Sequence, residues 1–224
     1  MAGLFITFEG GEGGGKSTQV ARLAERIAAL GREVVRTREP GGTEMAERIR
    51  ALLVNGEPEA LSSTAEALLN YAARDDHLRR LIRPALGRGA VVISDRFMDS
   101  TRAYQAYAGD CPLALVEALE REVVGETVPD MSIILDIDPA VGLARTRARG
   151  GAVDATAGQA AEDRFERFGL AFHQRLRAAF LRIAEENPER CVVVDAARPE
   201  EEVAADVWAA VAPLLGGGVD GSAA

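Results

Sequence analysis

The 224 residues suffice for one domain with a sizeable core, and a composition that is 47% hydrophobic and 27% charged excludes a disordered or fibrous protein. With 35 acidic against 26 basic side chains, the net charge of -9 argues against a nucleic-acid-binding surface, so an anionic ligand needs a local basic pocket. Two cysteines, no signal-peptide pattern and no apolar run of roughly 18 residues predict a cytoplasmic protein without disulfides or a membrane span.

Patterns typical of strands and helices alternate along the chain. Strands are expected at residues 4–9, 33–37, 90–94, 131–137 and 191–194. Helices are expected at residues 16–30, 43–54, 62–86, 99–107, 112–124, 139–148, 162–186 and 199–215. Because parallel strands need crossovers that pack on the sheet, this alternation predicts a three-layer α/β/α fold with a five-stranded parallel sheet flanked by helices. We expect residues 1–215 to form this single domain and residues 216–224 to form a flexible tail.

The loop after the first strand matches the phosphate-binding pattern of a glycine, four residues, a glycine, a lysine and a serine, in the strand–loop–helix context that the pattern requires. Its glycines let consecutive N–H groups turn toward a phosphate, Lys16 reaches the terminal phosphates, and Ser17 can ligate Mg²⁺. Lys16 is also the only lysine of the chain. A flexible glycine turn is the alternative. We favour a nucleoside triphosphate bound by Gly10, Gly11, Glu12, Gly13, Gly14, Gly15, Lys16, Ser17 and Thr18.

Charged pairs follow the second and third strands, at the sheet edge where the phosphate loop is expected. These pairs are Arg38–Glu39 and Asp95–Arg96, and ligands of parallel sheets collect at the carboxyl ends of strands. The Asp95 carboxylate can organise Mg²⁺ or the attacking oxygen, and the Arg96 guanidinium can bind phosphate oxygens. The alternative for each pair is an ion pair that braces a loop. Two such pairs beside one phosphate loop favour the binding roles.

Three arginines precede a glycine-rich segment near the end of the predicted helix 139–148. Arg145, Arg147 and Arg149 are either cations that stabilise a helix C-terminus or part of a lid at about residues 146–161. Such a lid closes over the phosphates, neutralises charge in the transition state and excludes water. We therefore treat Arg147 and Arg149 as candidate catalytic residues.

Other polar residues allow less specific interpretations. Asp136 and Asp138 also end a strand and compete with Asp95 for the role of organising Mg²⁺. His77 and His173 lie in predicted helices, and we interpret them as surface or core residues. Phosphoryl transfer needs positioning and charge more than it needs a histidine base.

Over about residues 4–212 the sequence resembles the bacterial thymidylate kinases. The phosphate loop alone is unspecific, whereas its combination with the later motifs is specific. The resemblance rests on Phe8-Glu9-Gly10 with the phosphate loop, Thr37-Arg38-Glu39-Pro40-Gly41-Gly42-Thr43, Tyr71-Ala72-Ala73-Arg74, Ser94-Asp95-Arg96-Phe97, Ser100-Thr101, Tyr104-Gln105 and Ile134-Leu135-Asp136.

The resemblance implies transfer of the γ-phosphate of ATP to thymidine monophosphate (dTMP), with Mg²⁺, to form the diphosphate for dTTP synthesis. It also implies a homodimer, and the helix 62–86 is a candidate for part of the interface. By position, Arg74 and Arg96 would hold the acceptor phosphate, and Glu9 would lie near the acceptor sugar. The remaining implied contacts are Arg38, Glu39 and Pro40 at the wall of the acceptor site, Thr101 with Tyr104 or Gln105 at the nucleoside, and Arg198 beside adenine.

One position departs from the family. The aromatic residue that stacks on thymine lies four positions before the helix arginine, and this position is Asn70 here, followed by Tyr71. Either Tyr71 supplies the ring or stacking on the base is weaker. Phe97 is expected only to pack.

Two other functions use the same fold. One is a kinase for another nucleoside or nucleotide. The other is a nucleotide-dependent switch, which is disfavoured because the guanine-reading Asn-Lys-x-Asp pattern is absent from this sequence.

Overall fold

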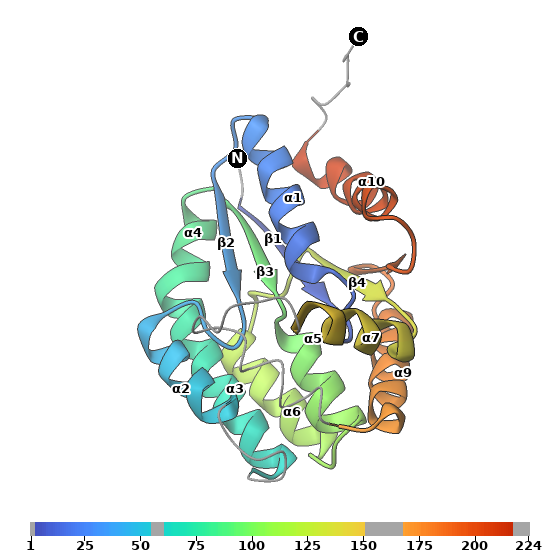
Figure 1. Cartoon of the computed structure of the whole chain (residues 1–224). Coiled ribbons are helices and arrows are strands. Elements are labelled where there is room, and N and C mark those ends of the chain that lie inside the picture. Colours follow the sequence, from blue (N-terminus) through green and yellow to red (C-terminus); the bar gives the residue numbers. More distant parts are fainter. Residues whose placement is uncertain (1–2, 55–60, 151–167, 217–224) are drawn as a thin grey trace.

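A computed structural model describes residues 3–54, 61–150 and 168–216. Five parallel strands form one sheet in the order β2-β3-β1-β4-β5, with helices on both faces (Figure 1). The strands are β1 (Leu4–Glu9), β2 (Val34–Arg38), β3 (Val91–Asp95), β4 (Met131–Asp136) and β5 (Cys191–Asp195). All five strands were predicted within about one residue of these bounds, and the three-layer α/β/α fold is confirmed.

The central strands send alternate side chains into two separate cores. Ile6 and Phe8 of β1 pack with α1 (Lys16–Ala29) and α10 (Glu200–Val211) on one face of the sheet. Phe5 points to the opposite face, where helices from the middle of the chain cover it. The other helices are α2 (Glu44–Val54), α3 (Ser63–His77), α4 (Arg83–Gly87), α5 (Met98–Thr101), α6 (Leu113–Leu119), α7 (Pro139–Gly150) and α9 (Leu170–Glu186).

The strand order places a ligand crevice beside β1. The connection that leaves β1 leads toward β2 and β3, whereas the connection that leaves β3 crosses to β4 on the other side of β1. Connections that diverge in this way open a crevice at the carboxyl ends of the strands, which is where parallel α/β sheets bind ligands.

Three predicted helices contain wide π-helical turns that hydrophobic periodicity did not reveal. These turns are η1 (Leu78–Ile82), η2 (Arg102–Tyr107) and η3 (Glu120–Val124). The η1 turn interrupts the predicted helix 62–86, and η2 and η3 form the C-terminal parts of the predicted helices 99–107 and 112–124. The η1 turn precedes Pro84, which has no N–H to donate and whose ring excludes the carbonyl group of Arg80 from its α-helical position. A wider turn accommodates the proline, and the chain continues as α4.

Two predicted helix boundaries need correction. Within the predicted helix 162–186, α9 begins at Leu170, because Gly169 has an extended backbone and is its N-cap, and residues 162–167 lie outside the described residues. The helix predicted at 139–148 continues to Gly150 as α7. Most of the predicted lid (151–161) and of the predicted tail (217–224) lies outside the described residues. Within the described ranges, no helix has the length and apolarity needed to cross a membrane.

A buried polar network joins β1, β4 and α5 beneath the crevice. Asp99, which is 1% exposed, accepts two hydrogen bonds from the Arg190 guanidinium, at 2.7 and 2.8 Å. The Ser132 hydroxyl donates to the same carboxylate at 2.8 Å and lies 2.9 Å from the hydroxyl oxygen of Thr7. A buried charge is stable only when it is paired and hydrogen-bonded, and here the pairing fixes α5 against the sheet.

We expect Arg190→Ala to lower the free energy of unfolding by about 3 kcal/mol, because it leaves the Asp99 carboxylate buried without its cation. The control is Arg48→Ala, which removes an exposed pair with Glu44 and is expected to cost less than about 0.5 kcal/mol. Urea unfolding of both variants measures the difference. Equal losses in the two variants would contradict a stabilising role for the buried pair.

Candidate active site

The phosphate loop connects β1 to α1 and requires glycine at several positions. Gly13 has a φ of 73°, and a Cβ there would lie 2.1 Å from the carbonyl oxygen of Gly142 in α7. Gly15, the N-cap of α1, has a φ of 82°. These conformations are accessible to glycine at little cost. The loop therefore packs closely on α7 and leaves the N-terminus of α1 open toward the crevice, as a phosphate site requires.

The side chains at the start of α1 suit a triphosphate and its metal ion. The Lys16 ammonium donates hydrogen bonds to the carbonyl oxygens of Gly10 and Gly11, at 3.2 and 2.7 Å. The Ser17 hydroxyl donates to the Asp95 carboxylate at 2.9 Å. Mg²⁺ prefers oxygen ligands and keeps several waters or phosphate oxygens, so two neighbouring protein oxygens fit it. Ser17 and Asp95 together meet this requirement.

The competing carboxylates are already engaged elsewhere. Asp136 forms a bidentate ion pair with Arg177, at 2.6 and 2.7 Å. Asp138 accepts a hydrogen bond from the backbone N–H of Ala140 at the start of α7. These contacts favour Asp95 over both residues as the carboxylate next to Mg²⁺.

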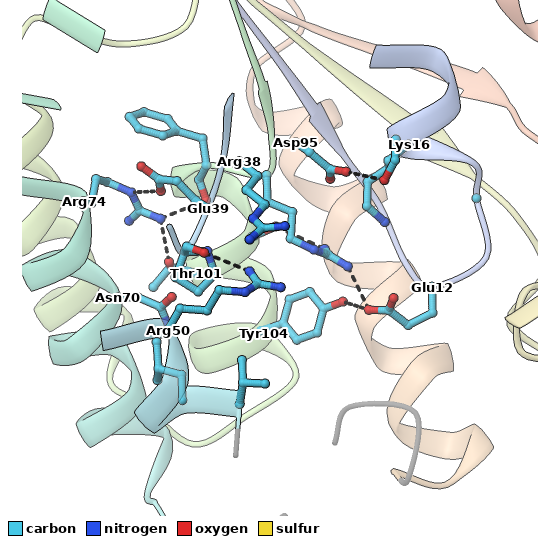
Figure 2. Close-up of a pocket in the computed structure, with 18 of the residues that line it drawn as sticks. Glu12, Lys16, Arg38, Glu39, Arg50, Asn70, Arg74, Asp95, Thr101 and Tyr104 are labelled. Carbon is cyan, nitrogen blue, oxygen red and sulfur yellow. Dashed lines mark hydrogen bonds and ion pairs between the residues drawn. The ribbon is translucent and has the colours of Figure 1, made fainter. Parts of the chain in front are cut away.

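One large cavity extends from the phosphate loop to α2 and α3 (Figure 2). It brings together most of the residues singled out from the sequence. The predicted residues that line it are Glu12, Gly13, Gly14, Gly15, Lys16, Ser17, Thr18, Arg38, Glu39, Pro40, Asn70, Arg74, Asp95, Arg96, Thr101, Tyr104 and Gln105. The predicted triphosphate and acceptor sites are thus two ends of one cavity.

Arg74 forms the buried end of the acceptor side. Its Nε donates to Glu39 at 2.7 Å, and its Nη2 donates to Thr101 and to the carbonyl oxygen of Phe97, both at 3.0 Å. Its Nη1 is buried and has no hydrogen-bond partner among the described residues. A buried donor of this kind is costly unless a ligand satisfies it. The cavity end therefore offers one unsatisfied cationic donor.

Arg96 joins the acceptor side to the phosphate loop. Its Nη2 donates to Glu12 at 2.8 Å and its Nη1 donates to the carbonyl oxygen of Gly10 at 3.0 Å. The Tyr104 hydroxyl donates to the same Glu12 oxygen at 2.7 Å (Figure 2). Burial opposes ionisation of Glu12, but Arg96 and Lys16 outweigh it and hold the pKa of that carboxyl below its usual value. Glu12 is therefore an anion inside the phosphate loop.

The backbone of Arg96 is held in a rare conformation. Its φ of 69° lies in the left-handed region, and Arg96 is the one non-glycine residue in the described ranges for which a positive φ is found. Its N–H donates to the carbonyl oxygen of Phe8, and the Ser94 hydroxyl donates to its carbonyl oxygen. Strain of this kind persists where surrounding contacts determine the conformation, and it is frequent at functional sites.

The sequence model of the thymidylate kinase family matches residues 8–207. The chain belongs to the thymidylate kinase family. It is 55% identical over 214 residues to the thymidylate kinase of Caulobacter vibrioides, with 96% of this chain and 98% of the relative covered. It is 48% identical over 210 residues to that of Magnetococcus marinus, covering 93% and 95% of the two chains. The resemblance predicted from the motifs is confirmed, and with it the expectation of a kinase.

The fold agrees with a solved structure of the same family. The crystal structure of thymidylate kinase from Ehrlichia chaffeensis aligns with a TM-score of 0.73 and 33% identity. The alignment covers 94% of this chain and 99% of the other. The family relationship thus extends over both ends of the cavity.

Glu9 does not occupy the place that family position implied. It was expected near the acceptor sugar, but it is fully buried and does not line the cavity. Its two carboxyl oxygens accept hydrogen bonds from the N–H of Phe97, at 2.8 Å, and from the Ser100 hydroxyl, at 2.5 Å. Strand alternation explains this, because Glu9 shares the face of Thr7 and points toward α5. Glu9 therefore supports the turn that carries Arg96.

Burial, reinforced by the Asp99 carboxylate, raises the pKa of Glu9 from 4.5 to about 7. Between these values the folded protein keeps a proton that the unfolded chain releases. The free energy of unfolding therefore falls as pH rises from about 4.5 to 7, by up to roughly 3 kcal/mol from this group. We expect Glu9→Gln to remove that slope in unfolding curves measured across this range. The exposed Glu25→Gln control should keep it, and an unchanged slope in Glu9→Gln would refute the assignment.

Tyr71 also lies away from the cavity. It is 1% exposed and packs beneath the Arg74 guanidinium, 4.5 Å from the centre of its ring. Burial raises the pKa of its phenol. Its ring therefore does not line the cavity, as a stacking ring in place of the missing one would. Asn70 does line the cavity, and Phe97, which was expected only to pack, lines it as well.

The predicted roles of Arg198 beside adenine and of the lid arginines stay predictions. Arg198 does not line the cavity and is ion-paired with Asp195, Glu202 and Asp206.

Arg145 donates to the carbonyl oxygens of residues 196 and 197 and so links α7 to the turn before Arg198. Arg147 is exposed on α7, and the Arg149 side chain lies outside the described part of the chain.

Sequence reasoning missed several residues that line the cavity. Arg50 of α2 donates to the carbonyl oxygen of Pro40 at 2.8 Å, and Leu53 and Val54 follow it one helical turn later. Arg50, Leu53 and Val54 have the i, i+3 and i+4 spacing of residues on one helix face, and the sequence alone shows this spacing. The missing information was that α2 packs this face, rather than another, against the acceptor loop, which is residues 39–43 between β2 and α2. Ser100 and Thr146 complete the set.

Proposed function

We propose that this chain transfers the γ-phosphoryl group of ATP to dTMP and forms dTDP, as a step toward dTTP. The observation that carries the proposal is a single cavity with a phosphate loop at one end and the Arg74 donor at the other, joined by Arg96. The relatives that cover nearly the whole chain are named thymidylate kinases.

The geometry supports in-line transfer without a covalent enzyme intermediate. The phosphate loop and Lys16 would hold the donor phosphates, and Arg96 would hold the acceptor next to them. Ser17 and Asp95 would hold Mg²⁺, which neutralises charge on the phosphate oxygens when it is bound. Catalysis then rests on alignment and electrostatic stabilisation.

Base recognition would rest on polar groups more than on a stacking ring. The Asn70 amide nitrogen donates to the carbonyl oxygen of Glu66 at 2.9 Å, which leaves the amide oxygen as an acceptor on a cavity-lining residue. Gln105 is fixed in a similar way, because its amide nitrogen donates to the Glu66 carboxylate at 2.9 Å. Fixed amides can discriminate bases by their hydrogen-bonding edges.

A coupled assay with ATP and a set of nucleoside monophosphates tests the function. We expect dTMP to be the preferred acceptor and turnover without an acceptor to be negligible. Preference for uridine or cytidine monophosphate would indicate another nucleotide kinase. Equal turnover without any acceptor would indicate a nucleotide-hydrolysing switch.

Lys16→Ala should lower kcat/KM by about a hundredfold or more, because the transferred phosphoryl group loses a positioned cation. Its melting temperature should stay close to that of the wild type. Arg48→Ala, on an exposed face of α2, is the activity control. Near wild-type turnover by Lys16→Ala would disprove the phosphate-loop assignment.

We also propose that lid arginines supply charge in the transition state, because the phosphate loop carries Glu12 and no arginine. Replacing Arg147 or Arg149 by alanine should then lower kcat, by up to about 10³-fold for one of them, and change the KM for dTMP much less. Steady-state kinetics beside a melting curve measures both effects. A lower melting temperature with kcat intact in both variants would indicate only a helix-capping role.

We propose a homodimer as the assembly. Leu52 of α2 is 64% exposed and Leu68 of α3 is 47% exposed, which supports an apolar contact surface on these helices. Light scattering should give about twice the chain mass of 23.8 kDa, and a monomer mass would contradict the proposal. The cytoplasmic location and the absence of nucleic-acid binding stay predictions.

A further inference from the structure

His77, at the end of α3, is completely buried and does not line the cavity. Its Nδ1 lies 2.9 Å from one oxygen of Glu39, and its Nε2 lies 2.7 Å from the Thr37 hydroxyl oxygen. We propose that His77 is a positioning residue, which acts through Glu39 to aim the Arg74 guanidinium at the acceptor nucleotide. This inference rests on the proposed function for the identity of the acceptor.

The hydrogen-bond partners determine which nitrogen of His77 carries the proton. An ionised Glu39 only accepts hydrogen bonds, and its other oxygen accepts from Arg74 Nε at 2.7 Å. His77 must therefore donate from Nδ1. The Thr37 hydroxyl can donate to Nε2 or accept from it, so it completes this end of the contact in either case. The result is one hydrogen-bonded chain from Thr37 through His77 and Glu39 to Arg74.

The burial of this chain makes its geometry well defined. The side chains of His77, Glu39 and Arg74 are 0%, 4% and 2% exposed, so water does not replace a lost partner easily. Gly42, at a φ of 86°, lies so close that a Cβ would come within 2.5 Å of both His77 Nε2 and the Thr37 hydroxyl oxygen. The imidazole is thereby enclosed between β2, α3 and the acceptor loop.

The Arg74 guanidinium, at the far end of this hydrogen-bonded chain, is the group that faces the ligand. Glu39 fixes Nε of Arg74, and the contacts to Thr101 and Phe97 fix Nη2. Nη1 is the one nitrogen of the Arg74 guanidinium that has no hydrogen-bond partner among the described residues, and Arg74 lines the cavity. The orientation of Glu39, together with the two contacts of Nη2, therefore sets where Nη1 points. His77 holds that orientation by occupying the second oxygen of the carboxylate.

Two variants separate positioning from packing. His77→Leu replaces the imidazole with an apolar side chain of similar size and so removes the donor to Glu39. His77→Asn is smaller but keeps an N–H donor near the position of Nδ1. We expect His77→Leu to raise the KM for dTMP about tenfold or more, since a hydrogen bond to a buried charge is lost. The KM for ATP should stay within about twofold of wild type, and His77→Asn should recover most of the dTMP affinity.

A double-mutant cycle tests the route through Arg74. In an Arg74→Gln background, His77→Leu should raise the KM for dTMP little further, because the group that His77 positions is already gone. An unchanged KM for dTMP in His77→Leu overturns the inference. So do parallel changes of both KM values without recovery in His77→Asn, and full additivity in the cycle, because each indicates a general structural role.

Wild-type kinetics keeps this test distinct from that of the proposed function. If wild type does not phosphorylate dTMP, the proposed function fails. The same variants are then compared on the acceptor that wild type does use. A KM change confined to that acceptor supports the role of His77, and its absence refutes it.

Discussion

The Arg96 guanidinium sets the distance between the two ends of the active site. It contacts the backbone and the Glu12 carboxylate of the phosphate loop. Arg96 itself lies in the turn between β3 and α5, at the start of the acceptor side of the cavity. In-line transfer requires the reacting atoms to be aligned closely, and a small displacement is costly in rate. The left-handed backbone of Arg96 and the buried Glu9 beneath the turn make that distance a property of the fold.

The interior below the cavity is charged to an unusual degree for a protein core. Ion pairs Arg74–Glu39 and Arg190–Asp99 are almost fully removed from water. Such pairs gain little over apolar packing, but breaking one is costly because a charge then stays buried alone. The charges in this layer therefore hold side chains in single orientations. A phosphate-binding site benefits from this rigidity, because its donors are in place before the ligand arrives.

Much of this could be predicted from the sequence, and the exceptions have physical causes. The strands and the phosphate loop follow from local patterns, so they were found almost to the residue. Glu9 was placed by family position, and Tyr71 was considered because it follows the family position at Asn70. Position along the chain gives a neighbourhood but not the direction of a side chain. Strand alternation, applied to Glu9, would have shown that it points away from the α1 face. The role of Arg50 depends on how α2 docks, which no local pattern contains.

The composition of the basic residues has a chemical consequence. All but one of the 26 cationic side chains are arginine, and the exception is Lys16, which is 8% exposed inside the phosphate loop. Reagents and acyl donors that react with side-chain amines therefore have one target in the chain, and that target lies where a triphosphate would cover it. Under the proposed function, acylation of this lysine would remove the cation that holds the donor phosphates. A bound nucleotide would at the same time shield the lysine from the reagent.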